Sequence, residues 1–384
     1  MAPIKHFLNN KGRILAAILP LFLFMPKGAY ASFMYKGLEI MPTASVQESY
    51  DDNITYTKSS PISDEITHML VGLGVTQQGK TESLNFNGSV DEQIYAKNTA
   101  FDNTSESFTA NYQQEISEYS RFKVDDIFSN SQNPTTFSDA FGRTSGRFTT
   151  LDNKVDLLFS HDMTEQLTYN VGYSNEQTIF DTDSQTNSSL NTAGAGLDYA
   201  LNSANILSLN YNYSQRDFAT GPYAITNEIA PNLRHFFTKQ LYLDLSAGVD
   251  FLRSFNGISY IRPLYTATLT NDIDKNTSAS ISYQQKYTTD TFTQDLFNIW
   301  EIVANVTRQL TDKLSIIFSG FWGQGKYITI GGNQGLTGAS ITVNYDLTKK
   351  TSLNAGYTFY NETSNIGLNA YTKNTAFFGI TIRF

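Results

Sequence analysis

The sequence contains no cysteine, only two tryptophans and four histidines, and just 16% of its 384 residues are charged. The absence of cysteine excludes disulfide bonds, thiol catalysis and cysteine-ligated metal sites. The net charge of −9 argues against a nucleic-acid partner, because phosphate binding needs basic patches. Beyond residues 14–25, no uninterrupted apolar run approaches the roughly 20 residues of a membrane-spanning helix. Any further membrane crossing must therefore be made by strands.

The N-terminus has the pattern of a secretory signal peptide. Lys5, Lys11 and Arg13 precede the apolar run of residues 14–25, and the run is followed by the A-x-A site Ala29-Tyr30-Ala31. We therefore predict that residues 1–31 form a cleaved signal peptide. The remaining residues 32–384 show no linker and no shift in composition, which predicts one domain.

The C-terminus has the pattern of a strand that crosses a lipid bilayer. Residues 374–384 place an apolar side chain at every second position and end on Phe384, and a tilted membrane strand needs about 9 to 11 residues. A terminal aromatic residue resembles the sorting signal of bacterial outer-membrane β-barrels, so Phe384 is the predicted C-terminal assembly signal and the barrel assembly machinery an expected partner. With 27 Phe, 23 Tyr and few charges, the composition is typical of a barrel with aromatic girdles and a polar interior.

Turns recur at regular intervals between alternating segments, and they give a strand count. Four of them, beginning at Met163, Phe237, Leu310 and Leu347, are variants of one short apolar-Thr-x-x turn. The full set of predicted short turns is residues 77–81, 118–120, 163–167, 202–204, 237–241, 271–276, 310–314 and 347–353. We place these turns on the periplasmic side and the longer polar loops outside. The predicted fold is all-β: a single transmembrane antiparallel up-and-down β-barrel of about 18 strands, in contact with outer-membrane lipid. A barrel of that size encloses an aqueous channel unless something fills it.

The parity of each strand predicts which residues face the lumen. The candidate pore-lining residues are Lys123, Asp125, Lys154, Asp156, Asp198, Asn210, Asn212, Glu228, Arg234, Tyr242, Asp244, Arg262, Glu301, Asn344 and Tyr360. Charges of both signs are interspersed, whereas strong ion selectivity needs rings of one sign. Neutral hydroxyl and amide groups with aromatics such as Phe321 and Phe377 match a hydrated sugar chain. The alternative is that polar residues line any water-filled barrel because they must be wet.

The sequence gives little support for catalysis, and we expect no enzyme activity, no cofactor and no metal site. His161 neighbours Ser160 and Asp162, but adjacent residues of a strand face opposite ways. The acid pairs Asp51-Asp52 and Asp125-Asp126 lack the spacing of a calcium loop. We expect Asp126, an outward acid, to lie at the rim of the membrane, where its cost is smallest.

At the end of the first predicted strand, Ser49-Tyr50-Asp51-Asp52-Asn53-Ile54 resembles an element of porin-like β-barrels encoded with exopolysaccharide secretion systems. The resemblance extends over the mature chain in length, strand pattern and terminal Phe384. It implies an 18-stranded outer-membrane barrel that passes a polysaccharide chain out of the cell together with periplasmic polysaccharide export proteins. It supplies no catalytic residues. Asp51, Asp52 and Asn53 either form a rim element or simply solvate a strand end.

Two functions remain open: a passive conduit for exopolysaccharide export, and a general or sugar-preferring diffusion porin. A diffusion porin usually has a long loop folded inward with opposed charge clusters. The best candidate, residues 129–146, has only Asp139 and Arg143 as charged residues. We therefore expect a wider, weakly selective channel. No outward face stands out as a trimer interface, so we expect a monomer.

Overall fold

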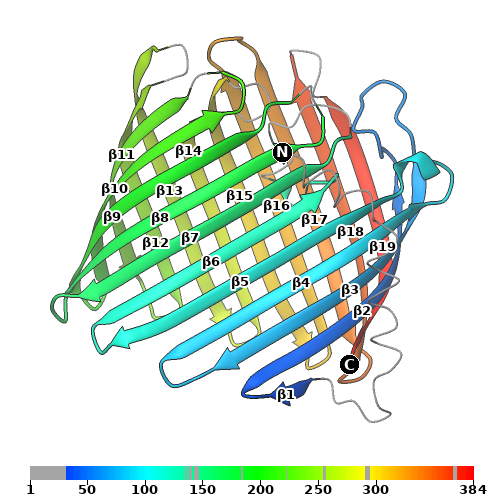
Figure 1. Ribbon diagram of the computed structural model, residues 1–384, viewed down its shortest axis with the longest axis horizontal. Helices are drawn as coiled ribbons and strands as arrows, with labels where there is room; N and C mark the ends of the chain where they lie inside the picture. Colours follow the sequence, from blue (N-terminus) through cyan, green and yellow to red (C-terminus); the bar gives the residue numbers. More distant parts are fainter. Residues whose placement is uncertain are drawn as a thin grey trace.

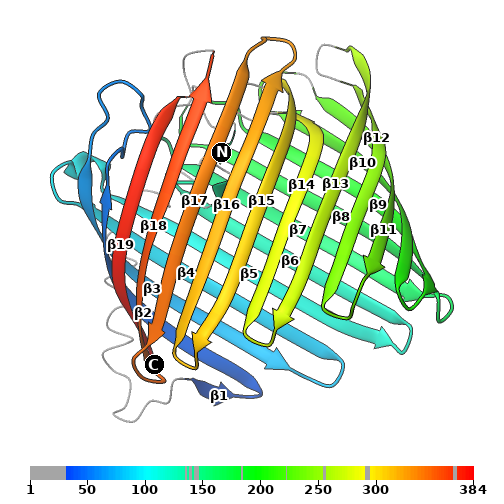
Figure 2. The ribbon, with the colours of Figure 1, turned by 180° about the vertical axis from the view of Figure 1, so that it is seen from behind.

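Each strand of the protein pairs with its neighbour in sequence, and the last long strand pairs with the first (Figures 1 and 2). The computed structural model describes residues 32–134, 136–137, 141, 147–182, 185–221, 223–253, 257–289, 295–365 and 370–384. Strands β2 to β19 form one closed antiparallel barrel of 18 strands, and the three-residue β1 pairs only with the start of β2. The predicted fold class and strand number are confirmed.

The elements have these bounds: β1 Phe33–Tyr35, β2 Leu38–Asp51, β3 Asp64–Gln78, β4 Glu82–Tyr95, the 3-10 helix η2 Thr99–Phe101, β5 Asn103–Ser117, β6 Ser120–Ser131, β7 Thr150–Asp162, β8 Leu167–Phe180, β9 Ser188–Asn202, β10 Asn205–Phe218, β11 Ala224–Phe236, β12 Leu241–Arg253, β13 Ser259–Asp274, β14 Thr277–Thr289, β15 Leu296–Thr311, β16 Leu314–Tyr327, β17 Asn333–Asp346, β18 Thr351–Ser364 and β19 Tyr371–Arg383. The predicted signal peptide, residues 1–31, lies outside the described residues. Within the described part of the chain, no helix has the length and apolar character needed to span a membrane.

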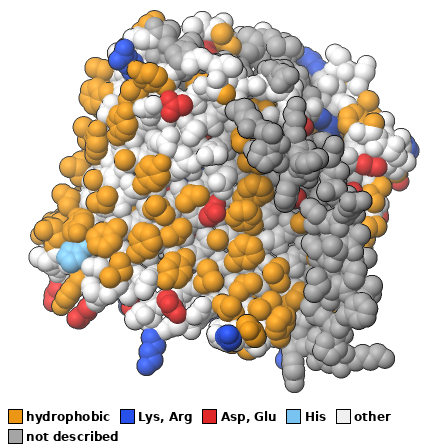
Figure 3. All heavy atoms as spheres, viewed as in Figure 1, with side chains coloured by type: hydrophobic (Ala, Val, Ile, Leu, Met, Phe, Trp, Pro, Cys, Tyr) orange, Lys and Arg blue, Asp and Glu red, His pale blue; other side chains and the backbone are white. Residues whose placement is uncertain are grey.

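The two faces of the wall differ because side chains alternate along each strand. On β10, Leu207, Leu209 and Tyr211 are exposed on the outside, while Ser208 and Asn210 alternate with them. Figure 3 shows apolar side chains spread over the outer wall with few charged ones among them. This outer surface suits lipid, and the closed ring leaves no strand edge unpaired in the hydrocarbon.

The eight predicted short turns all lie between strands of the barrel. Four of these turns share a threonine that caps the turn. The Thr164 hydroxyl accepts hydrogen bonds from the backbone N–H groups of Gln166 and Leu167, at 3.2 and 3.0 Å. Thr238, Thr311 and Thr348 do the same for the residues two and three positions further on. The hydroxyl thus satisfies donors that the turn would otherwise leave to water.

The expected rim position of Asp126 is wrong. Asp126 lies in the middle of β6, directly opposite Ala110 of β5 and Val155 of β7. The prediction overlooked a donor on the neighbouring strand, because Asn153 Nδ2 donates a hydrogen bond to the Asp126 carboxylate at 2.8 Å. A satisfied carboxylate is less costly in an apolar setting than a free one.

Candidate functional site

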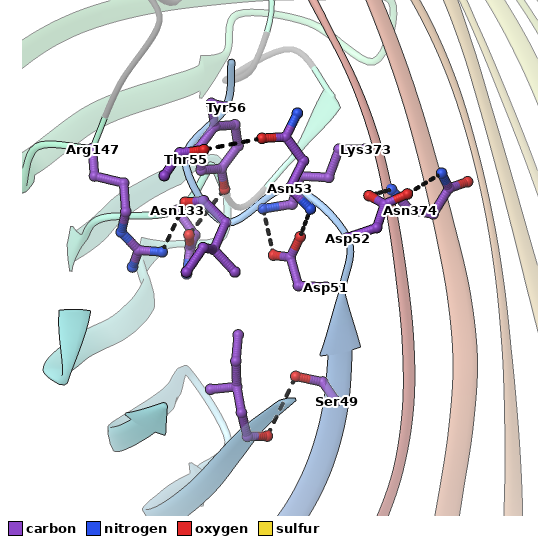
Figure 4. Close-up of polar contacts among 12 residues, drawn as sticks. Ser49, Asp51, Asp52, Asn53, Thr55, Tyr56, Asn133, Arg147, Lys373 and Asn374 are labelled. Carbon is purple, nitrogen blue, oxygen red and sulfur yellow. Dashed lines mark hydrogen bonds and ion pairs between the residues drawn. The ribbon is translucent and has the colours of Figure 1, made fainter. Parts of the chain in front are cut away.

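The segment after β2 folds into a buried core rather than into solvent. Asp51, Asn53, Ile54 and Tyr56 are each at most 4% exposed. Asn53 organises the segment. Its backbone N–H donates to Asp51 Oδ1 at 2.9 Å (Figure 4). Its Nδ2 donates to the carbonyls of Thr57 and Thr372 at 2.8 and 2.9 Å. Ile54 packs with Ile66 and Tyr95. The Asp51-Asp52-Asn53 element therefore does more than solvate a strand end.

The same element fastens the seam where the barrel closes. The Asp52 carboxylate accepts hydrogen bonds from the backbone N–H and the Nδ2 of Asn374, at 2.7 and 2.6 Å. One residue earlier, Asp51 pairs with Lys373 Nζ at 2.7 Å, and both side chains are only 6% exposed. Lys373 Nζ also lies 3.8 Å from the centre of the Tyr56 ring. Two consecutive residues of β19 are thus held by two consecutive acids at the end of β2 (Figure 4).

The segment after β2 also holds the loop between β6 and β7, residues 132–149. The Tyr56 hydroxyl donates to Asn133 Oδ1 at 2.9 Å. At the other end of the loop, Arg147 donates to the Ile54 carbonyl at 3.1 Å and to Gln132 Oε1 at 3.0 Å. The Arg147 guanidinium lies over the rings of Tyr95 and Phe101, at 5.0 and 5.3 Å from their centres. Both ends of the loop are therefore pinned against the inner wall.

The middle of this loop reaches the opposite wall. Phe137 packs against Phe321 and Tyr360, and Phe141 packs against Phe321 and Phe297. Strands β15 to β18, which carry the wall residues, lie about half the ring away from β6 and β7. A contact between these two regions must cross the lumen, so the loop folds inward. We call the described residues of this segment (132–134, 136–137, 141 and 147–149) the lumen loop.

The inward fold of the lumen loop argues against the wider channel that was expected from the small number of charges in residues 129–146. Among the described residues, aromatic packing holds the middle of the lumen loop inward. Gly338 makes room for it, because a Cβ at that position would collide with the Phe137 ring. Phe321 is only 3% exposed and Tyr360 is half-buried under Phe137, so neither offers a free surface to a sugar. Asp139 and Arg143 lie outside the described residues.

Many of the predicted pore-lining charges form ion pairs along the wall. Lys123 pairs with Asp125 at 2.7 Å and Lys154 with Asp156 at 3.0 Å, each within one strand. Arg234 pairs across strands with Asp244 at 2.6 Å. Cancelling charges this closely weakens the field that an ion meets in the lumen.

The remaining predicted residues have more varied surroundings. Two of the acids accept hydrogen bonds from amides: Asp198 from Asn170 and Glu301 from Gln284. Two of the residues take part in cation–ring contacts: Tyr242 lies under the Arg234 guanidinium, and Arg262 lies over Tyr260 and Tyr287. The others are placed by strand register: Asn210 and Asn212 face Gly196 and Gly194, Glu228 stands opposite Asn212 and Asp250, and Asn344 stands opposite Ser315 and Asn354. Phe384 donates its backbone N–H to the Pro42 carbonyl at 3.0 Å. Contact of these residues with a permeating solute, and the sorting role of Phe384, stay predictions.

The sequence reasoning missed the residues that build the lumen loop's support: Lys373, Tyr95, Phe101, Phe137 and Arg147. Lys373 shares the parity of Thr375 and Phe377, so its inward position was readable. Its partner Asp51 is 322 positions away, and only closure of the ring brings the two together.

Comparison with known proteins found a family model that is similar to the C-terminal third of the chain. The model of the family described as "Putative beta-barrel porin 2" matches residues 262–384, the C-terminal third of the chain. No curated protein gives a significant sequence match. Similar solved structures include Acinetobacter baumannii OccAB4 (TM-score 0.48, 10% identity, 90% of this chain and 98% of that chain) and Pseudomonas aeruginosa OpdQ (TM-score 0.49, 9% identity, 91% and 100%). The FrpB iron transporter of Neisseria meningitidis also matches (TM-score 0.45, 10% identity), with 87% of this chain and 64% of that chain covered.

Proposed function

Because this chain is a porin-like β-barrel channel of the bacterial outer membrane, we propose that it is a passive conduit for a slender, uncharged hydrophilic polymer, an exopolysaccharide chain leaving the cell. The observation that carries this proposal is the pairing of charges along the wall. In three pairs the positive and negative charges cancel, because the nitrogen and the carboxylate oxygen lie at most 3.0 Å apart: Lys123–Asp125, Lys154–Asp156 and Arg234–Asp244. A wall of this kind neither attracts nor repels a neutral solute electrostatically, and it leaves hydroxyls and amides as the groups that the solute meets.

Ladders of such neutral groups support the proposal. Ser89 and Ser107 share a hydrogen bond of 2.9 Å, as do Thr192 and Ser214. Hydroxyl groups both donate and accept, so they can exchange their partners for the hydroxyls of a moving sugar chain at little cost.

A diffusion porin for small solutes is the second candidate, and the lumen loop is the observation that favours it. Phe137 and Phe141 narrow the passage by crossing to β15–β18. A narrowed lumen suits small solutes, but it also suits a single extended polymer chain.

An export role implies that the barrel has protein partners. A polymer must reach the periplasmic mouth from its export machinery, so we propose that a periplasmic polysaccharide export protein docks at the short turns. The barrel assembly machinery would insert the chain through its C-terminal strand. We further propose that the barrel works as a monomer, because each barrel would enclose its own complete pathway.

Single-channel recording in planar bilayers tests the two functions. Neutral oligosaccharides of increasing length are added to the purified barrel, and the blocked time of the current is measured. Export of a polymer predicts block that lengthens steadily with chain length, because a longer chain occupies more of the lumen. A size cut-off at a few sugar units, with longer chains unable to enter, would favour the diffusion porin and overturn the conduit.

The double variant Phe137→Ala/Phe141→Ala is the matched control. It removes the aromatic anchors of the lumen loop and leaves the charged wall intact. If the loop sets the cut-off, the variant admits longer chains. If the wall alone selects the solute, the block by oligosaccharides is unchanged.

A further inference from the structure

The inner wall of β10 to β14 contains a pocket of about 300 Å³, away from the lumen loop and its contacts. Its lining includes Arg216, Glu228, Asp250, Gln284, Lys286 and Tyr287. We call it the wall pocket. Its volume lies at the lower end of the roughly 300–1,000 Å³ typical of small-molecule sites.

Asp250 is the anomaly in the wall pocket. Asp250 is only 3% exposed, and its Oδ1 has no hydrogen-bond partner. No described residue forms an ion pair or a hydrogen bond with its carboxylate. By contrast, Asp125 and Asp244 each lie within 2.7 Å of a cationic nitrogen. An unpaired buried ionised acid is costly, and Oδ1 is therefore open to a hydrogen-bond donor from a ligand that enters the pocket.

An unpaired donor stands next to this unpaired acceptor. Arg262 lies directly opposite Asp250 in the pairing of β12 with β13. Its guanidinium rests over the rings of Tyr260 and Tyr287, at 4.8 and 5.0 Å, and its Nε is buried without a partner. The wall therefore holds one free acceptor and one free donor on adjacent strands.

The charges around the wall pocket decide which ligand fits. Arg216 is already paired with Glu176 at 3.0 Å. Lys286 disfavours a free cation, and Glu228, which stands opposite Asp250 in the pairing of β11 with β12, disfavours an anion. A neutral group that both donates and accepts meets neither penalty. Hydroxyls have this property, and Gln284 adds an amide that can bond a further one. The tyrosine ring of Tyr287 supplies the apolar surface that a sugar ring can cover.

We propose that the wall pocket is a sugar-binding subsite, in which Asp250 accepts a hydrogen bond from one hydroxyl of a hexose unit and Gln284, which also lines the pocket, donates to a neighbouring one. Arg262 lies beside the pocket and is not part of its lining. This inference rests on the proposed function, since it names where a passing carbohydrate chain pauses. Asp250 is then a specificity residue, and its burial before sugar arrives makes it a pre-organised acceptor.

The test uses the full-length barrel with maltohexaose and cellohexaose as probes. Binding is measured by calorimetry in detergent and by current block in planar bilayers. Asp250→Asn keeps the side-chain shape but removes the charged acceptor, so we expect sugar affinity to fall about tenfold or more. Asp272→Asn is the control, because Asp272 is exposed near the end of β13 and does not line the wall pocket; its sugar affinity should stay within about twofold of the wild type.

The outcomes separate this proposal from the proposed function. Equal affinity in Asp250→Asn and wild type would overturn the subsite while leaving the conduit intact. Calcium alone binding to the wild type but not to Asp250→Asn, with no effect of the variant on sugar, would also overturn it, in favour of a cation site. If neither oligosaccharide blocks or binds the wild type, the proposed function itself fails. Should Asp250→Asn not fold, as judged by heat-modifiable migration in gels, Glu228→Gln replaces it, and we expect a weaker, several-fold loss of sugar affinity.

Discussion

Asp51 and Lys373 form the most enclosed ion pair among the described residues, and each also contacts the segment after β2. Such pairs stabilise little relative to apolar substitutes, but they are costly to break because one charge is then left buried. The pair lies at the seam between the first and last strands of the ring. Its value to the fold is therefore tied to closure of the barrel.

We predict that Lys373→Met destabilises the barrel by about 3–5 kcal/mol, because Asp51 keeps its charge and loses its partner. The double variant Asp51→Asn/Lys373→Met should recover much of that loss, since no buried charge remains. Urea unfolding in detergent micelles, followed by tryptophan fluorescence, measures both. Arg383→Met is the control: its pair with Asp346 is exposed, and we expect a change of at most about 1 kcal/mol. Additive single effects of Asp51→Asn and Lys373→Met would show that the two side chains are not coupled.

At the scale of elements, the lumen loop is the feature that narrows the channel. It is held at its base by Asn133 and Arg147 and at its middle by Phe137 and Phe141. The strands that it reaches carry glycine where the loop's rings approach most closely, at Gly323 and Gly338. Loop and wall are thus complementary in shape.

A cross-link tests this arrangement directly, because the sequence has no native cysteine. We predict that Phe137→Cys/Gly338→Cys forms a disulfide on oxidation, since a Cβ at position 338 would touch the Phe137 side chain. The disulfide is detected as a mobility difference between reduced and oxidised protein in non-reducing gels. The pair Phe137→Cys/Gly356→Cys is the control, because the atoms nearest to a Cβ at Gly356 belong to Phe377 and Ile341 and none of them to Phe137. Failure of the first pair to cross-link, or equal cross-linking of both, would count against the inward fold.

At the scale of the whole molecule, six of the ten predicted pore-lining charges cancel in three ion pairs. The field along the channel is then weak, and the ions that cross it meet hydroxyls and amides instead. This property follows from the arrangement of side chains around the ring and not from the net charge of −9.

We predict that the wild-type channel has a reversal potential near zero in a salt gradient. The double variant Asp125→Asn/Asp156→Asn frees Lys123 and Lys154 on two adjacent strands, so the reversal potential should shift toward anion selectivity. Planar-bilayer recordings provide the measurement. Asp346→Asn, at the end of β17, frees the exposed Arg383 of β19 and should shift the reversal potential less. An unchanged reversal potential in the double variant would place these lysines away from the ion path.

The sequence by itself determined the class, strand number, turn positions and outer surface of this protein. Alternation, terminal Phe384 and the repeated threonine turns are local signals, and each is set by backbone geometry within a few residues. Only the tertiary structure decided what fills the lumen. Phe137 meets Phe321 184 positions later, and Asp51 meets Lys373 322 positions later. Closure of the ring sets which distant strands face one another, and no periodicity along a single strand encodes that pairing.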